Sequence, residues 1–196
     1  MIYSLLDPPD VKRYDDMTRT EAKKHLEWYL SQIPERLELL KDAFEFTGGG
    51  AKEKLDYSVE SLRIMWEWFI PQVTTEPKTT AELEKEAKIL PGGKSRNLER
   101  LSIGTLAIAM DIAIYLAEVF IRTCKNVNWG LAKSRSKNYI NYNRPVLLGF
   151  MAGKYEDELD ACRILNNITL KVAFDGDKNP DALINVFGSW EKKIVS

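Results

Sequence analysis

Residues 103–121 form an almost uninterrupted apolar stretch, and it constrains the fold more than any other part of the chain. The stretch consists mostly of Ile, Leu, Ala and Val, with one acid at its centre, Asp111, and another near its end, Glu118. It is long enough for a membrane-spanning helix, but an acidic group at mid-bilayer costs roughly 2.5–3.5 kcal/mol even on the translocon-based scale. We therefore expect a buried helix over 103–124, capped by Ser102, at the centre of the fold.

Length and composition indicate a single soluble domain. The 196 residues are 44% hydrophobic and 29% charged, a balance typical of globular proteins. The two cysteines, Cys124 and Cys162, have no CxxC or metal-binding spacing, which indicates reduced thiols. Residues 1–10 lack the basic and apolar regions of a secretory signal. We therefore predict a cytoplasmic protein that does not associate with membranes.

Apolar periodicity predicts a mainly helical α+β domain, 1–196, with one small antiparallel sheet packed on the central helix. Apolar residues recur at spacings of three and four from Ala22 to Phe44, which predicts a helix kinked by Pro34 or two nearly coaxial helices. Ser58 and Asn179 are the expected caps of two later helices. The expected elements are an N-terminal arm at 1–17, helices at 18–46, 58–72, 80–89, 103–124, 157–173 and 181–193, and a β-hairpin or sheet at 127–150.

Residues 122–154 contain no Asp or Glu and carry a local charge of +7. Because the whole chain carries −1, the remainder sums to −8 (−1 − 7). Alternating apolar and polar residues predict strands at 127–131, 139–142 and 146–150 within this basic run. A positive field of this kind steers association with an acidic partner. The cations of the run are Arg122, Lys125, Lys133, Arg135, Lys137, Arg144 and Lys154.

Few residue types in the chain suit catalysis or metal binding. His25 is the single histidine and neither cysteine is near it in sequence, which disfavours a catalytic triad or a Cys–His dyad. One histidine and two separate cysteines also cannot supply the usual ligands of zinc. We therefore expect no metal site and no cofactor.

Two acids on the central helix support a different enzymatic hypothesis. Asp111 and Glu118 lie two turns apart on one helix face, about 10 Å by helical rise, a spacing that allows acid–base catalysis through a water. The alternative is a structural polar stripe in which Glu118 pairs with Arg122 four residues later. We prefer the structural interpretation and assign no catalytic residue.

Two motifs resemble those of a family of uncharacterised bacterial proteins. Residues 55–62 read LDYSVESL and are followed by Trp66 and the pair at 68–69, which resembles the pattern LD-x-S-x-E-S-L and then W-F. Residues 115–121 read YLAEVFI and are followed by Trp129, which is similar to a Y-L-G-E-V helix and a tryptophan strand. Together the motifs cover roughly residues 20–175.

The resemblance carries implications for function. Some members of that family look like immunity proteins encoded beside secreted toxins, so the resemblance implies a cytoplasmic, non-enzymatic binder. Ala117 stands where members often carry Gly, a change that a site requiring only a small side chain tolerates. The resemblance supplies no established active residues.

We hypothesise that the protein acts by binding another protein, and a toxin-neutralising role is the narrower form of this hypothesis. The first alternative is a nucleic-acid-binding module that uses the basic aromatic hairpin, although a pI near 6.0 disfavours it. The second is the carboxylate-based enzyme. The expected binding surface comprises Asp111, Tyr115, Glu118, Arg122, Trp129, Arg135, Tyr139, Tyr142 and Arg144.

Overall fold

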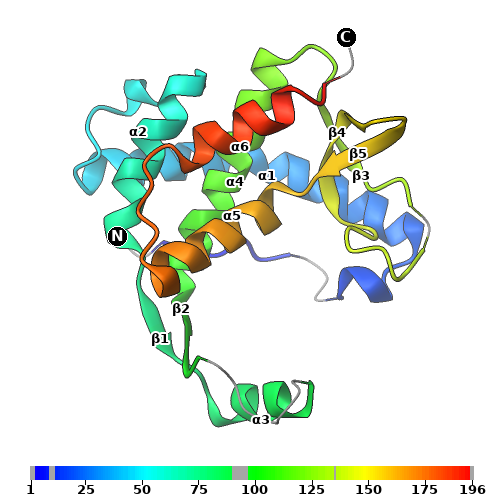
Figure 1. Cartoon of the computed structure of the whole chain (residues 1–196), viewed down its shortest axis with the longest axis horizontal. Helices are drawn as coiled ribbons and strands as arrows, with labels where there is room; N and C mark the ends of the chain where they lie inside the picture. The colour runs from blue at the N-terminus through cyan, green and yellow to red at the C-terminus, as the bar shows by residue number, and fades with distance from the viewer. Residues whose placement is uncertain (1–2, 9–11, 90–96, 135, 195–196) are drawn as a thin grey trace.

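The computed structural model describes residues 3–8, 12–89, 97–134 and 136–194. Over these ranges the chain forms six α-helices and two small antiparallel sheets, as expected for a mainly helical α+β fold, with one more sheet than the sequence predicts. Figure 1 shows the helices, except the one at 80–89, packed around one central helix, with the three-stranded sheet at one end. The helices are α1 (Arg19–Phe46), α2 (Val59–Phe69), α3 (Thr80–Ile89), α4 (Ile103–Thr123), α5 (Ala161–Leu170) and α6 (Ala182–Glu191).

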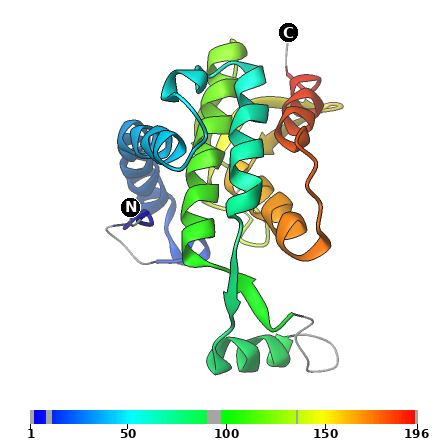
Figure 2. The ribbon, with the colours of Figure 1, turned by 90° about the vertical axis from the view of Figure 1, so that its left-hand side faces the viewer.

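The central helix, α4, is the core of the molecule, as the apolar stretch predicts. It contacts α1, α2, α5 and α6, which surround it in Figure 2. All six consecutive residues 112–117 are completely buried, so every side of the helix is covered at its middle. In the described part of the chain α4 is the one helix long and apolar enough to cross a membrane, and 67% of its most apolar window lies inside the molecule.

The first helix, α1, is one continuous helix that contains Pro34, so the two-helix alternative is not observed. It starts with a capping box: the backbone N–H of Glu21 donates to the Thr18 hydroxyl, and the Glu21 side chain accepts from the Thr18 backbone N–H. Ile33, Leu37, Leu40 and Phe44 of the predicted stripe are buried, in the same hydrophobic core as the residues of α4. The predicted stripe is therefore the packing face of this helix.

The three-stranded sheet has the order β3 (Asn128–Leu131), β4 (Pro145–Ala152) and β5 (Tyr155–Leu159), all antiparallel. The strand predicted at 139–142 is wrong. The Tyr139 and Tyr142 backbone N–H groups instead donate to carbonyls three residues earlier, and Asn143 takes a left-handed φ of 57°. Asn favours such turns because its side chain tolerates the left-handed region, and this outweighs the strand preference of tyrosine.

The helix predicted at 157–173 begins later than expected, because β5 occupies its first residues. A turn at Gly153 returns the chain antiparallel to β4, and Asp160 then caps α5 by accepting from the Arg163 backbone N–H at 2.9 Å. The last helix also differs in detail. Asn179 accepts from the Asp181 backbone N–H at 3.0 Å, so it organises the turn before α6 and Asp181 occupies the cap position.

An unpredicted two-stranded sheet carries α3 away from the rest of the molecule. Strands β1 (Thr75–Pro77) and β2 (Glu99–Leu101) pair antiparallel, and Figures 1 and 2 show α3 projecting at their far end. We call the described part of residues 75–101 the arm. Arg100 braces it, with guanidinium nitrogens 2.7 Å from Glu76 of β1 and 2.6 Å from Glu82 of α3.

Replacing Arg100 by Ala should loosen the arm without unfolding the body. The two partly exposed ion pairs contribute roughly 0.2–1 kcal/mol each, which predicts amide hydrogen exchange in α3 faster by roughly two- to thirty-fold. The matched control is Arg63→Ala, which removes ion pairs to Glu67 and Asp181 on the body. Exchange in α3 that is equal in both variants would contradict this account of the arm.

Candidate functional site

The predicted site residue Asp111 lies in the interior and is fully buried. The Arg36 side chain of α1 donates to it twice, from Nε at 2.9 Å and from Nη2 at 2.7 Å. The Tyr3 hydroxyl also donates to this carboxylate, and Arg36 donates to the Ser4 carbonyl at 2.8 Å. Burial raises the pKa of Asp111, against the opposing effects of Arg36 and Tyr3. Asp111 therefore joins α1, α4 and the N-terminal segment, and its expected place on a binding surface is wrong.

Tyr115 is likewise a structural residue and not part of a surface, contrary to the sequence-based expectation. It is fully buried, and its hydroxyl lies 2.7 Å from the Ser61 hydroxyl and accepts from the Tyr57 backbone N–H at 3.0 Å. Burial raises the pKa of Tyr115 to about 12. The Tyr57 ring stacks on Tyr115 with centroids 4.9 Å apart, and the Arg122 guanidinium lies 3.6 Å from the Tyr57 centroid.

The expected ion pair between Glu118 and Arg122 is confirmed, with Nε 3.7 Å from Oε2. Together with the burial of Asp111, it supports the structural interpretation of the polar stripe on α4. The hypothesis of acid–base catalysis by Asp111 and Glu118 is not supported by this geometry. Asp111 is enclosed by packed side chains, and both of its oxygens already accept hydrogen bonds from Arg36.

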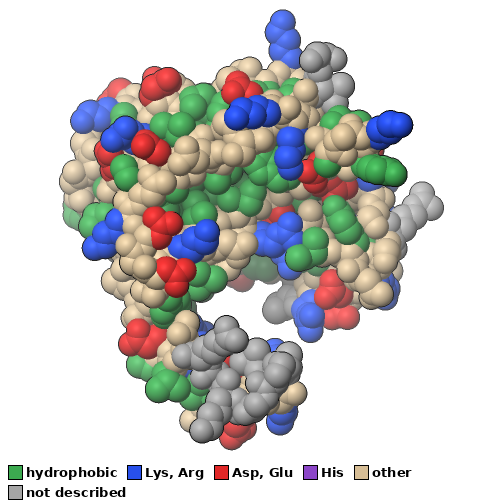
Figure 3. Space-filling view, viewed as in Figure 1, with side chains coloured by type: hydrophobic (Ala, Val, Ile, Leu, Met, Phe, Trp, Pro, Cys, Tyr) green, Lys and Arg blue, Asp and Glu red, His purple; other side chains and the backbone are tan. Residues whose placement is uncertain are grey.

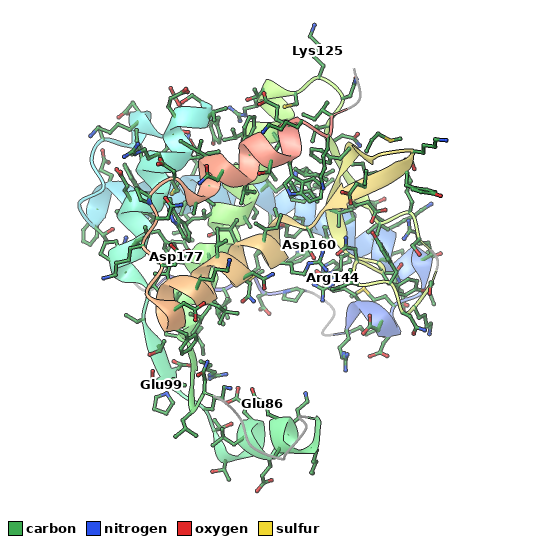
Figure 4. The ribbon with its side chains drawn as sticks, in the orientation of Figure 1. Glu86, Glu99, Lys125, Arg144, Asp160 and Asp177 are labelled. Carbon is green, nitrogen blue, oxygen red and sulfur yellow. The ribbon has the colours of Figure 1, made fainter. Side chains whose placement is uncertain are left out.

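The basic run divides into paired and unpaired cations. Arg122 pairs with Glu118, and Lys133 pairs with Glu156. An Arg144 nitrogen lies 3.8 Å from Asp160, a proximity visible in Figure 4. Arg135 lies outside the described residues. The remaining three cations are exposed and have no ion pair with any residue that the structure describes: they are Lys125, Lys137 and Lys154.

The aromatic residues of the basic run are only partly available. Trp129 is half-buried and packs edge-on against Tyr29 of α1, with centroids 5.5 Å apart. Tyr142 and Tyr139 are half-buried in the loop between β3 and β4. Burial and the nearby Glu158 carboxylate raise the pKa of Tyr139. The eight expected residues that the structure describes thus do not form one surface, because Asp111 and Tyr115 are buried in the interior.

The residues that sequence analysis missed belong to β5. Glu156, Asp157 and Glu158 line a cavity of about 240 Å³ together with Lys133 and the middle of β4. The available signal was three consecutive acids directly after an acid-free run. The helix predicted at 157–173 includes two of these acids, whereas in β5 they follow the alternation of side chains that a strand imposes.

A second group of reactive residue types surrounds Cys162 at the start of α5. The Tyr29 hydroxyl lies 3.8 Å from its Sγ, and the Tyr14 hydroxyl lies 3.3 Å from Nε2 of His25. Burial, aided by the charge of Asp160, raises the pKa of Cys162 to about 12. The thiol is therefore protonated at neutral pH and unsuited to nucleophilic attack. Among the described residues, no group of three or more His, Cys, Asp or Glu side chains could hold a metal ion.

Cys162 should resist alkylation in the folded protein. A thiol pKa raised from 9.0 to about 12 lowers the thiolate fraction at pH 8 by about a thousandfold. Iodoacetamide labelling of a Cys124→Ala variant, followed by mass spectrometry, should show that modification is far slower in buffer than in 6 M guanidinium. Comparable rates in the two solvents would show that the thiol is not held in its neutral form.

The Arg36–Asp111 pair should behave as one energetic unit. Asp111→Leu or Arg36→Met alone leaves a buried charge without a partner and should lower the free energy of unfolding by about 3–5 kcal/mol. Urea denaturation should show a much smaller loss for the Arg36→Met, Asp111→Leu double variant than for the sum of the singles. Additive losses would mean that the two charges do not depend on each other.

Comparison with known proteins gives no match: no protein-family model, no curated protein and no solved structure is similar to this chain. The functional argument therefore rests on the geometry of the chain itself, and the resemblance to bacterial immunity-like proteins remains a hypothesis from sequence motifs.

Proposed function

We propose that this protein acts by binding an acidic surface of another protein with the end of the molecule that carries the three-stranded sheet. We define the sheet end by its exposed cations and large exposed apolar side chains. The observation that supports the proposal is that three cations of the basic run have no ion pair with any described residue and are exposed. The same segment exposes two large apolar side chains, Tyr155 at 79% and Ile140 at 64%. The sheet end comprises Lys125, Lys137, Ile140, Lys154 and Tyr155.

The sheet end combines two properties of protein interfaces. Its lysines come from the turn after α4, the β3–β4 loop and the β4–β5 turn, and Figure 4 shows Lys125 pointing away from the body. Unpaired charges at a rim accelerate association with a surface of opposite sign. Tyr155, adjacent to Lys154 in the same turn, offers a large aromatic ring of the kind that anchors interfaces.

A nucleic acid fits this surface less well than an acidic protein does. Glu156, Asp157 and Glu158 lie on the same sheet, and Figure 3 shows acidic side chains among the basic ones on the sheet side of the molecule. A phosphate backbone carries negative charge along its whole length and would be repelled there. An acidic protein surface can place its charges opposite the lysines alone. The narrower hypothesis, from the sequence motifs, is that the partner is a toxin.

The proposal predicts that charge reversal of the sheet end abolishes partner binding. The test variant is Lys125→Glu, Lys137→Glu, Lys154→Glu, and the control reverses three exposed lysines elsewhere: Lys23, Lys24 and Lys85. A partner protein that both the wild type and the control variant retain from lysate would be purified. Its affinity would then be measured for the wild type, the test variant and the control variant. The test variant should bind at least tenfold more weakly, and wild-type affinity should fall with rising salt because the attraction is electrostatic.

Two results would contradict the proposal. One is equal affinity of the test and control variants for the purified partner. The other is tight, salt-dependent binding of single-stranded RNA or DNA by wild type, lost in the test variant, which would assign the sheet end to nucleic acid.

A further inference from the structure

The cavity on the three-stranded sheet is lined by Glu158, and the fold leaves one oxygen of its carboxylate without a partner. Glu158 is 7% exposed, and its Oε1 accepts from the Lys133 backbone N–H at 2.5 Å. Its Oε2 is buried and has no hydrogen-bond partner. The Tyr139 hydroxyl is the nearby side-chain donor: burial and its interaction with the Glu158 carboxylate raise the pKa of that tyrosine, but it forms no hydrogen bond of good geometry with Oε2. A buried carboxylate oxygen without a hydrogen-bond partner is costly, so a donor supplied by a ligand would stabilise this position.

The neighbouring charges do not neutralise Glu158. Glu156 pairs with the Lys133 ammonium, and Asp157 pairs with Lys193 at 2.8 Å. The three acids and two lysines leave a charge of −1 (−3 + 2) at the cavity. One additional positive charge would therefore neutralise the site.

The apolar part of the lining limits the kind of cation that fits. Leu148, Phe150 and Met151 of β4 line the same cavity of about 240 Å³, where the β4–β5 pairing shifts register between Leu147 and Phe150. Apolar side chains complement an alkyl chain, and a carboxylate complements its charged end. A bare metal ion is disfavoured, because the described part of the chain offers no cluster of three suitable ligands.

We propose that this cavity binds a primary alkylammonium group, with Glu158 Oε2 accepting from the ammonium and β4 side chains covering the alkyl stem. Such a group is found both in free aliphatic amines and in lysine side chains. The proposal is independent of the acidic protein partner proposed above, since it concerns a different set of side chains and the opposite charge.

Titration with n-butylammonium chloride, followed by amide chemical shifts, tests the proposal. Saturable shifts should centre on residues 148–151 and 156–158, while n-butanol, the neutral analogue, should cause none. Glu158→Gln should weaken binding at least tenfold, whereas Glu60→Gln, an exposed acid on α2, should leave it unchanged. Equal binding by the Glu158→Gln variant, or shifts spread over the whole surface, would overturn the proposal.

Thermal unfolding without amine provides a second readout. The Gln side chain can still accept from the Lys133 N–H through its amide oxygen, and it removes a buried charge that lacks a partner. Glu158→Gln should therefore be as stable as wild type or more stable. A destabilised variant would show that the carboxylate is already satisfied within the fold and would overturn the proposal. N-acetyl-lysine methylamide, run beside n-butylammonium, distinguishes a lysine side chain from a free amine.

Discussion

The pairing of Arg36 with Asp111 is the constraint on which the rest of the structure depends. An apolar helix with one carboxylate at its centre can be enclosed only if that charge is compensated inside the protein. Arg36 supplies the compensation from α1, and Tyr3 and Ser4 complete it from the N-terminal segment. The pair therefore fixes a point of contact where α1 crosses α4 (Figure 2), and it explains why an acid occurs within an otherwise apolar core helix.

The sequence predicted what depends on local pattern. The apolar stretch located α4, and Ser58 and Ser102 cap α2 and α4 as expected. Pairings between distant residues could not be inferred in this way. Arg36 and Asp111 are 75 positions apart, and nothing in the periodicity of either helix links them. Strands β1 and β2 were missed because three residues are too few to show an alternating pattern.

The candidate site was less predictable than the fold for a related reason. The acid-free run correctly marked a region of excess positive charge, but which cations remain unpaired depends on tertiary contacts. Lys133 lies opposite Glu156 only because β5 returns beside β4. The same return places Glu158 in a cavity. One small sheet thus presents two surfaces of opposite character, a cationic rim and an anionic hollow, within a few strands of each other.

The arm is a place where chain length can change without affecting the packing of the body. Its ion pairs join β1, α3 and β2 to one another, and both strands run from the body in register. A short reverse turn from Pro77 to Glu99 would close the same ribbon and leave α1, α2 and α4 undisturbed. Insertions and deletions in homologous chains should concentrate at this point, and it is a natural position at which to graft a peptide tag.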